Sequence, residues 1–179
     1  MFDPTAFDNM KVVLEGTIYD LDIDGVINVI DRNDLMNLAK MSREFDVSFE
    51  MAGEKQFPIV AKFHLKAKLE NLASELLLEA KNSSIAGCHL ELSFSFMHKN
   101  EQVYFERIND LFLSIWGENR SILQTATFNP FKKNDYINNK VKVGFHRVIE
   151  ESQLDDLTEV VPYMLDTIKK INYVLQDTH

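Results

Sequence analysis

Two segments of this chain, 44–51 and 60–68, alternate strictly between apolar and polar side chains. Alternation with period two places the apolar side chains on one face of a β-strand and the polar ones on the other. Strands with one buried and one wet face are typical of antiparallel sheets. Turn-forming residues lie between the segments, at Gly53 and Pro58, so we expect a hairpin. Its buried face would hold Phe45, Val47, Phe49, Met51, Phe63, Leu65 and Ala67.

Periodicity predicts the remaining elements. Further apolar runs predict strands at 11–19, 90–97, 121–128 and 140–149. Spacings of three and four predict helices at 33–41, at 69–81, from an Asn100 cap to Trp116 before Gly117, and at the C-terminal end. Together they predict a single α+β domain, 1–179, with a mainly antiparallel sheet and two or three helices on one face. Residues 1–43 would form a strand, an acidic turn and a short helix, and 44–179 the main sheet and helices.

Pro162 complicates the start of the last helix. A proline inside a helix costs about 3 kcal/mol and kinks the axis. If Ser152 is the N-cap, Pro162 lies well inside the helix, whereas Thr158 as the N-cap would place it in the first turns. We therefore expect the later start, or a kink at Pro162.

Composition excludes several classes of protein. The chain has 179 residues, 45% of them hydrophobic, which is too many for a disordered protein. No apolar run approaches the roughly 20 residues of a membrane helix, and the first residues do not resemble a secretory signal. Cys88 is the only cysteine, so no internal disulfide is possible and a cytoplasmic location is expected. The net charge of −9 argues against nucleic acid as a partner.

The segment 20–31 has the spacing of an EF-hand calcium loop. Such loops place oxygen ligands at positions 1, 3, 5, 7, 9 and 12, with glycine at position 6. Gly25 is the sixth residue here, and the Val26 carbonyl is at position 7. The segment resembles a dockerin half-repeat, which implies Ca²⁺ as a cofactor. The side-chain ligands would be Asp20, Asp22, Asp24, Asn28 and Asp31.

A β-hairpin is the alternative for the same segment, and it is the one we favour. Asp-Gly between alternating apolar residues is a strong hairpin signal. A tight turn at Asp24-Gly25 would pair Ile23 with Ile27 and Leu21 with Val29. The remaining aspartates would then be solubilising charges on an edge.

Basic residues line two of the predicted strand faces. They are Lys62, His64, Lys66 and Lys68 on one strand, and Lys140, Lys142 and His146 on another. One interpretation is a groove for an anionic ligand or an acidic partner. The interpretation we favour is charge pairing, because the strand with Glu44, Asp46 and Glu50 should lie beside Lys62, His64 and Lys66.

No catalytic motif is recognisable. The histidines are scattered, and Cys88 and His89 are neighbours whose side chains would point to opposite faces of a strand. We expect Cys88 to be a small core residue. No catalytic residue is assigned and the protein is expected not to be an enzyme, although a site assembled from distant residues stays an open alternative.

The expected C-terminal order β-α-β-β-α, the size and the acidity are similar to those of secretion-chaperone-like proteins. That resemblance implies binding of a protein partner by a small dimer. The sequence thus predicts a non-enzymatic protein-binding or chaperone-like regulatory module, with a homodimer as one form. Neither nucleic acid nor membrane is expected as a partner, and calcium binding through 20–31 is the alternative function.

Overall fold

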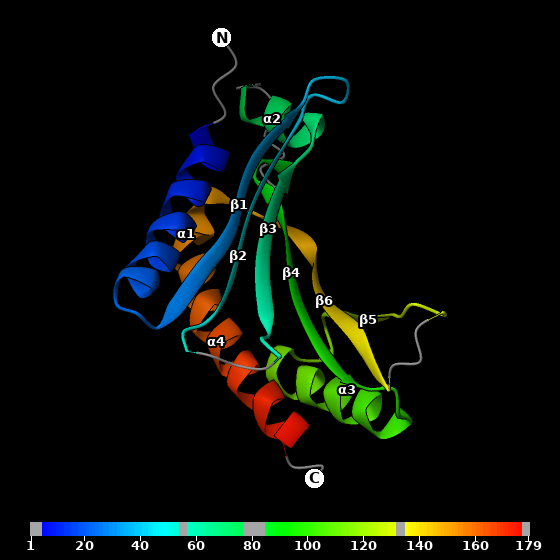
Figure 1. Ribbon diagram of the computed structural model, residues 1–179. Coiled ribbons are helices and arrows are strands. Elements are labelled where there is room, and N and C mark those ends of the chain that lie inside the picture. Colours follow the sequence, from blue (N-terminus) through cyan, green and yellow to red (C-terminus); the bar gives the residue numbers. More distant parts are fainter. Residues whose placement is uncertain (1–4, 54–56, 77–84, 132–134, 177–179) are drawn as a thin grey trace.

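The computed structural model describes residues 5–53, 57–76, 85–131 and 135–176. Over these residues it contains four α-helices and one six-stranded antiparallel sheet with the order β1-β2-β3-β4-β6-β5 (Figure 1). The predicted α+β class is therefore confirmed. In chain order the elements are α1 (Thr5–Ile23), β1 (Ile27–Asn37), β2 (Ser42–Met51), β3 (Val60–Ala67), α2 (Leu69–Leu76), β4 (Cys88–Lys99), α3 (Gln102–Trp116), β5 (Ser121–Thr127), β6 (Tyr136–Ile149) and α4 (Leu154–Gln176), which a short 3₁₀ turn, η2 (Glu151–Gln153), precedes.

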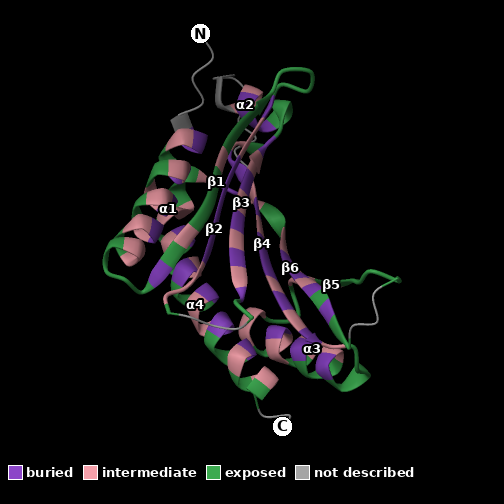
Figure 2. Cartoon of the chain, in the orientation of Figure 1, coloured by how far each residue is buried: buried purple, intermediate pink, exposed green. Residues whose placement is uncertain are grey.

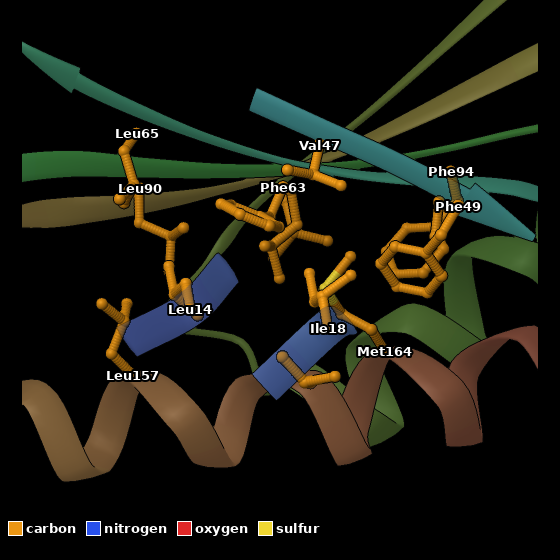
Figure 3. Packing of buried hydrophobic residues seen from close by; sticks show 14 of the residues in the cluster. Leu14, Ile18, Val47, Phe49, Phe63, Leu65, Leu90, Phe94, Leu157 and Met164 are labelled. Carbon is orange, nitrogen blue, oxygen red and sulfur yellow. The ribbon is translucent and has the colours of Figure 1, made fainter. Parts of the chain in front are cut away.

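Helix α4 packs against both α1 and α3, and these three helices cover one face of the sheet (Figure 1). Between the layers lies a core rich in phenylalanine. Figure 3 shows Leu14 and Ile18 of α1 and Met164 of α4 pointing toward Phe63 and Phe94 of the sheet. All five are almost completely buried. Burial of each such side chain stabilises the fold by roughly 1.5–3 kcal/mol.

The strands predicted from alternation are confirmed. Along β3, every second residue is buried, as the alternating colours of Figure 2 show. Strand β2 pairs antiparallel with β3, with Phe45 opposite Leu65 and Val47 opposite Phe63. The expected strands at 90–97, 121–128 and 140–149 correspond to β4, β5 and β6, and β6 begins earlier, at Tyr136.

The first element is a helix, so the predicted strand at 11–19 is wrong. The buried residues of α1 are Phe7, Met10, Leu14 and Ile18, with spacings of three and four. This helical stripe begins before residue 11, and a window that starts at Lys11 contains too little of it. Of the β-branched residues inside that window only Ile18 belongs to the stripe, and Val12 is exposed.

Asp24 and Gly25 end α1, so the favoured hairpin at this position is also wrong. The N–H of Val26 donates to the Leu21 carbonyl over 2.9 Å, and the N–H of Gly25 donates to the Asp22 carbonyl over 3.0 Å. These two hydrogen bonds define a Schellman motif. Gly25 has φ +68°, the left-handed conformation that the residue after a helix C-cap adopts there.

The predicted helix at 33–41 is wrong because those residues belong to β1 and to its turn into β2. Strand β1 is at the edge of the sheet, and its apolar residues Leu35 and Met36 are both exposed. Because both faces of this edge strand are exposed, its apolar and polar residues do not alternate. Without that alternation, the spacing of its apolar residues resembles that of a helix. Met41, in the turn, has φ +52°, which is uncommon for a residue with a side chain.

The other helices agree with expectation except at their ends. Helix α2 begins at Leu69, and the predicted part beyond residue 76 lies largely outside the described residues. Helix α3 has Glu101, not Asn100, at its N-cap, and Gly117 at its C-cap as predicted. Helix α4 begins at Leu154 and continues through Pro162, so the expected late start is wrong. The buried stripe on both sides of Pro162 holds α4 together: Leu157, Val161, Met164, Ile168 and Ile171.

Candidate functional site

The face of the sheet opposite the helices is polar, and its charges pair as predicted. The carboxylate of Glu44 contacts Lys66 at 2.5 Å and His64 at 3.1 Å, and Asp46 contacts Lys62 at 2.7 Å. The hydrogen bond from Lys66 is the largest influence that lowers the pKa of Glu44. The face thus neutralises its own charge between β2 and β3. At the β6 side Lys142 pairs with Glu91 over 2.9 Å, whereas no ion pair of Lys140 occurs among the described residues.

The residues proposed as calcium ligands are distributed over three elements. Asp20 and Asp22 lie in the last turn of α1, Asp24 in the turn that follows, and Asn28 and Asp31 on β1. One oxygen of Asp22 accepts the Val29 N–H over 2.9 Å, which joins the end of α1 to β1. In the described ranges, no three His, Cys, Asp or Glu side chains are grouped so as to hold a metal ion. Calcium binding by this segment stays a prediction.

The thiol and the most buried histidine both have structural contacts. Cys88 is buried, with its Sγ 3.4 Å from the Sδ of Met10, consistent with its expected place in the core. His98 Nδ1 lies 2.7 Å from the Lys99 carbonyl. The amide of Asn139 bridges His98 Nε2 and the side chain of Gln124, which in turn donates to the Phe105 carbonyl. This buried network joins β4, β5, β6 and α3.

The two edges of the sheet differ in their protection. Edge strand β1 carries Asp31, Arg32 and Asp34 and a bulge between Val29 and Asp31. Charges and bulges are the devices that prevent another strand from pairing with an edge. Arg32 and Asp34 are further tied to α1, by Glu15 at 2.5 Å and Lys11 at 2.7 Å respectively.

Edge strand β5 has none of these devices. Its sequence, 121–127, contains no charged residue and no proline, and it pairs with β6 in an unbroken register. Leu123 is 56% exposed and Phe128, just after the strand, is 65% exposed. Figure 2 shows this side of the sheet as largely exposed. The outward backbone groups of β5 are thus available to a further strand.

A small aromatic groove lies where β5 ends. Phe128 and Tyr136 line a cavity of about 190 Å³, together with Met97. The ring of Phe57 stacks on Tyr136, with centroids 5.4 Å apart. We call β5 with Phe128 and this groove the open edge.

A second cavity, of about 320 Å³, lies between the end of α3, the last part of β6 and the start of α4. Three aromatic side chains line it: Trp116, Phe145 and Tyr163. Trp116 lies 6.3 Å from Phe145 and 6.0 Å from Tyr163, centroid to centroid. The guanidinium of Arg120 is 4.7 Å from the centroid of the Phe145 ring. We call this the aromatic cavity.

No family model, curated protein or solved structure matches this chain. Among the described helices, none has the length and apolar character required to cross a membrane.

Sequence reasoning missed both the open edge and the aromatic cavity. The lack of charge in 121–127 is visible in the sequence, but the position of β5 at the edge depends on the order of strands. Trp116 and Phe145 belong to apolar patterns that are typical of core residues, and both line the cavity.

Proposed function

We propose that this protein is a non-enzymatic protein-binding module that takes up an extended segment of a partner protein along β5. The observation that supports this function is the open edge, an uncharged and regular edge strand in a sheet whose other edge is protected. Addition of a strand to such an edge is a common mode of peptide recognition. The backbone hydrogen bonds supply affinity, and side chains at alternate positions supply specificity.

The charges beside β5 indicate the chemistry of the partner segment. Lys140 is directly opposite Thr125, and Lys142 is opposite Leu123, on the polar face of the sheet. Strands β5 and β6 carry two lysines and one arginine, Arg147, and no acid, although the whole chain has a net charge of −9. An added strand would lie about 10 Å from β6, within reach of a lysine and a glutamate side chain. We therefore propose an acidic residue at the position that faces Lys140, which has no ion pair among the described residues. A second acidic residue would face Lys142, where it would compete with Glu91.

The other positions of the partner strand would face the helix layer. There Ile122 packs against the core, and Gln124 is held by the Phe105 carbonyl. Apolar side chains suit these positions, and an aromatic residue suits the groove beside Phe128. The proposed partner is thus an extended segment that alternates between apolar and acidic residues.

The test uses a ten-residue peptide of alternating valine and glutamate, compared with the same peptide carrying lysine in place of glutamate. Calorimetric titration should show binding of the first and at least tenfold weaker binding of the second, since close charge complementarity is worth about 1.4 kcal/mol or more here. Hydrogen exchange should slow at β5 amides when the first peptide binds.

A matched pair of variants locates the binding. Leu123→Asp places a carboxylate on β5 that repels the acidic peptide, and should reduce its affinity about tenfold. Ile30→Asp makes the same change at a similarly exposed residue of the β1 edge, where Ile30 is 49% exposed, and should leave the affinity unchanged. Equal weakening by both variants, or failure of the valine–glutamate peptide to bind at millimolar concentration, would contradict the proposal.

A second copy of the chain could pair with β5 in place of the acidic segment, and the experiment distinguishes these two partners. Antiparallel self-pairing of β5 about Gln124 brings no like charges together. Light scattering would then detect a dimer that Leu123→Asp dissociates and Ile30→Asp does not. That outcome would replace the acidic segment by a second copy.

A further inference from the structure

The lining of the aromatic cavity carries charges of both signs, and the two signs come from different elements. Arg120, from the segment between α3 and β5, and Arg147, on β6, contribute the positive charges. Asp156 and Glu159, both on α4, contribute the negative charges. No ion pair within 4.0 Å joins these four side chains in the described part of the chain. The lining of the cavity thus holds two bases and two acids that do not pair with one another.

Trp116, one of the residues that line the cavity, also carries an unsatisfied group. The Nε1 of Trp116 is buried and has no hydrogen-bond partner among the described residues. A buried donor without an acceptor costs about 1–3 kcal/mol, so such groups usually hold a water or a ligand atom. The Trp116 ring itself lines the cavity beside Phe145.

Size and lining restrict the ligand. A cavity of about 320 Å³ is at the lower end of the range for small-molecule sites. Its aromatic lining favours an apolar or aromatic group. A guanidinium pair favours a carboxylate, and the carboxylates of α4 favour an ammonium group. A ligand with only one charge would leave the bases or the acids without a partner.

We infer that the aromatic cavity binds a free α-amino acid with an aromatic or large apolar side chain, in its zwitterionic form. The carboxylate faces Arg120 and Arg147, the ammonium group faces Asp156 and Glu159, and the side chain lies on the rings of Trp116 and Phe145. This binding site is independent of the open edge, and it would make the protein responsive to the supply of an amino acid.

The experiment uses Trp116 as its own reporter, because it is the only tryptophan in the chain. Its fluorescence, excited at a wavelength at which phenylalanine does not absorb, is followed during titration with L-phenylalanine. Two analogues separate the charges: N-acetyl-L-phenylalanine lacks the ammonium group, and L-phenylalaninamide lacks the carboxylate. We expect saturable binding of L-phenylalanine and about tenfold weaker binding of each analogue.

Surface variants test the bases and the acids without disturbing the core. Arg147 and Glu159 are exposed, so Arg147→Gln and Glu159→Gln should both fold and should each weaken L-phenylalanine about tenfold. Arg107→Gln, on the exposed part of α3 and outside the cavity, is the matched control and should bind like the natural protein.

Four results would overturn the inference. One is no change in Trp116 fluorescence and no heat at ten millimolar L-phenylalanine. Another is equal affinity for all three compounds, because the charged side chains would then play no part. The third is equal weakening by the control variant. Preference for the N-acetylated compound would instead assign the cavity to a peptide C-terminus, which also contradicts a free amino acid.

Discussion

The Nε2 atom of His98 lies 3.0 Å from the Nδ2 atom of Asn139, and this contact identifies His98 as a neutral imidazole. Nδ1 faces the Lys99 carbonyl at 2.7 Å and must therefore donate its proton there. Nε2 is then the acceptor for the Asn139 amide. Protonation of Nε2 would set two donors against each other inside the sheet.

The first prediction concerns pH. Burial lowers the pKa of His98, and burial likewise lowers the pKa of His89. The unfolded chain, with histidine near its ordinary pKa of about 6.5, then binds protons more readily than the folded chain. The free energy of unfolding should therefore be highest above the histidine pKa of the unfolded chain. It should decrease as the pH falls through that pKa toward the lower pKa of the folded protein.

Urea midpoints at pH 7.5, 6.5 and 5.5 check this dependence. The decrease should be smaller in a His89→Gln/His98→Gln variant than in the natural protein. The stabilisation associated with Glu44, whose pKa is lowered mainly by Lys66, is lost only in a more acidic range. An identical pH dependence in both proteins would show that the two histidines do not contribute.

A second prediction tests the helical nature of the N-terminal segment. Leu14 is buried against the sheet, whereas Val12, two residues earlier, is 61% exposed. Leu14→Ala should lower the free energy of unfolding by about 2–5 kcal/mol. Val12→Ala should change it by no more than about 0.5 kcal/mol. Denaturant unfolding measures both, and comparable losses would be incompatible with α1 as described.

The third prediction compares a glycine inside α1 with the glycine that follows the C-cap of that helix. Gly25 has a left-handed backbone, so Gly25→Ala should destabilise by about 1 kcal/mol even though no atom lies within 4 Å of the added Cβ. Gly16 lies inside α1, exposed and equally unobstructed, so Gly16→Ala should stabilise by about 0.5–1 kcal/mol. Thermal melts should therefore shift in opposite directions. A shift in the same direction would exclude the Schellman motif at Gly25.

The fourth prediction concerns Pro162. Proline has no N–H to donate to the carbonyl of Thr158 four residues earlier, and its ring crowds that carbonyl. Because Pro162 is exposed, Pro162→Ala removes no core packing. It should raise the free energy of unfolding by about 1–3 kcal/mol. Calorimetry would detect the higher melting temperature, and a decrease would mean that the proline shapes α4 in a way that the fold requires.

Prediction from sequence succeeded where a strand has one buried face and one wet face. Phe45, Val47 and Phe49 determine the orientation of β2 by themselves, and the positions of Glu44 and Lys66 then imply their ion pair. Prediction failed for β1, because Leu35 and Met36 are both exposed at the edge of the sheet. Apolar and polar residues therefore do not alternate along this strand. It failed for α1 because Phe7 and Met10 lie outside the window that appeared to be a strand.

The candidate sites were harder to predict because they depend on topology. The residues of β5 are uncharged in the sequence, but whether a neutral strand is central or at an edge is decided by where β6 inserts. Trp116, Phe145 and Tyr163 come from three separate elements, so only the packing of α3 and α4 against β6 brings them together.

The unequal edges of the sheet also limit how far this protein can assemble. Each pairing between two sheets uses one free edge of each molecule. A molecule with two free edges could therefore add further molecules indefinitely. In this sheet β5 can pair with one added strand, whereas the bulge and the charges of β1 prevent another strand from pairing at the opposite edge. On the proposed function, assembly through the sheet would therefore stop at two members, because only β5 is open to a further strand.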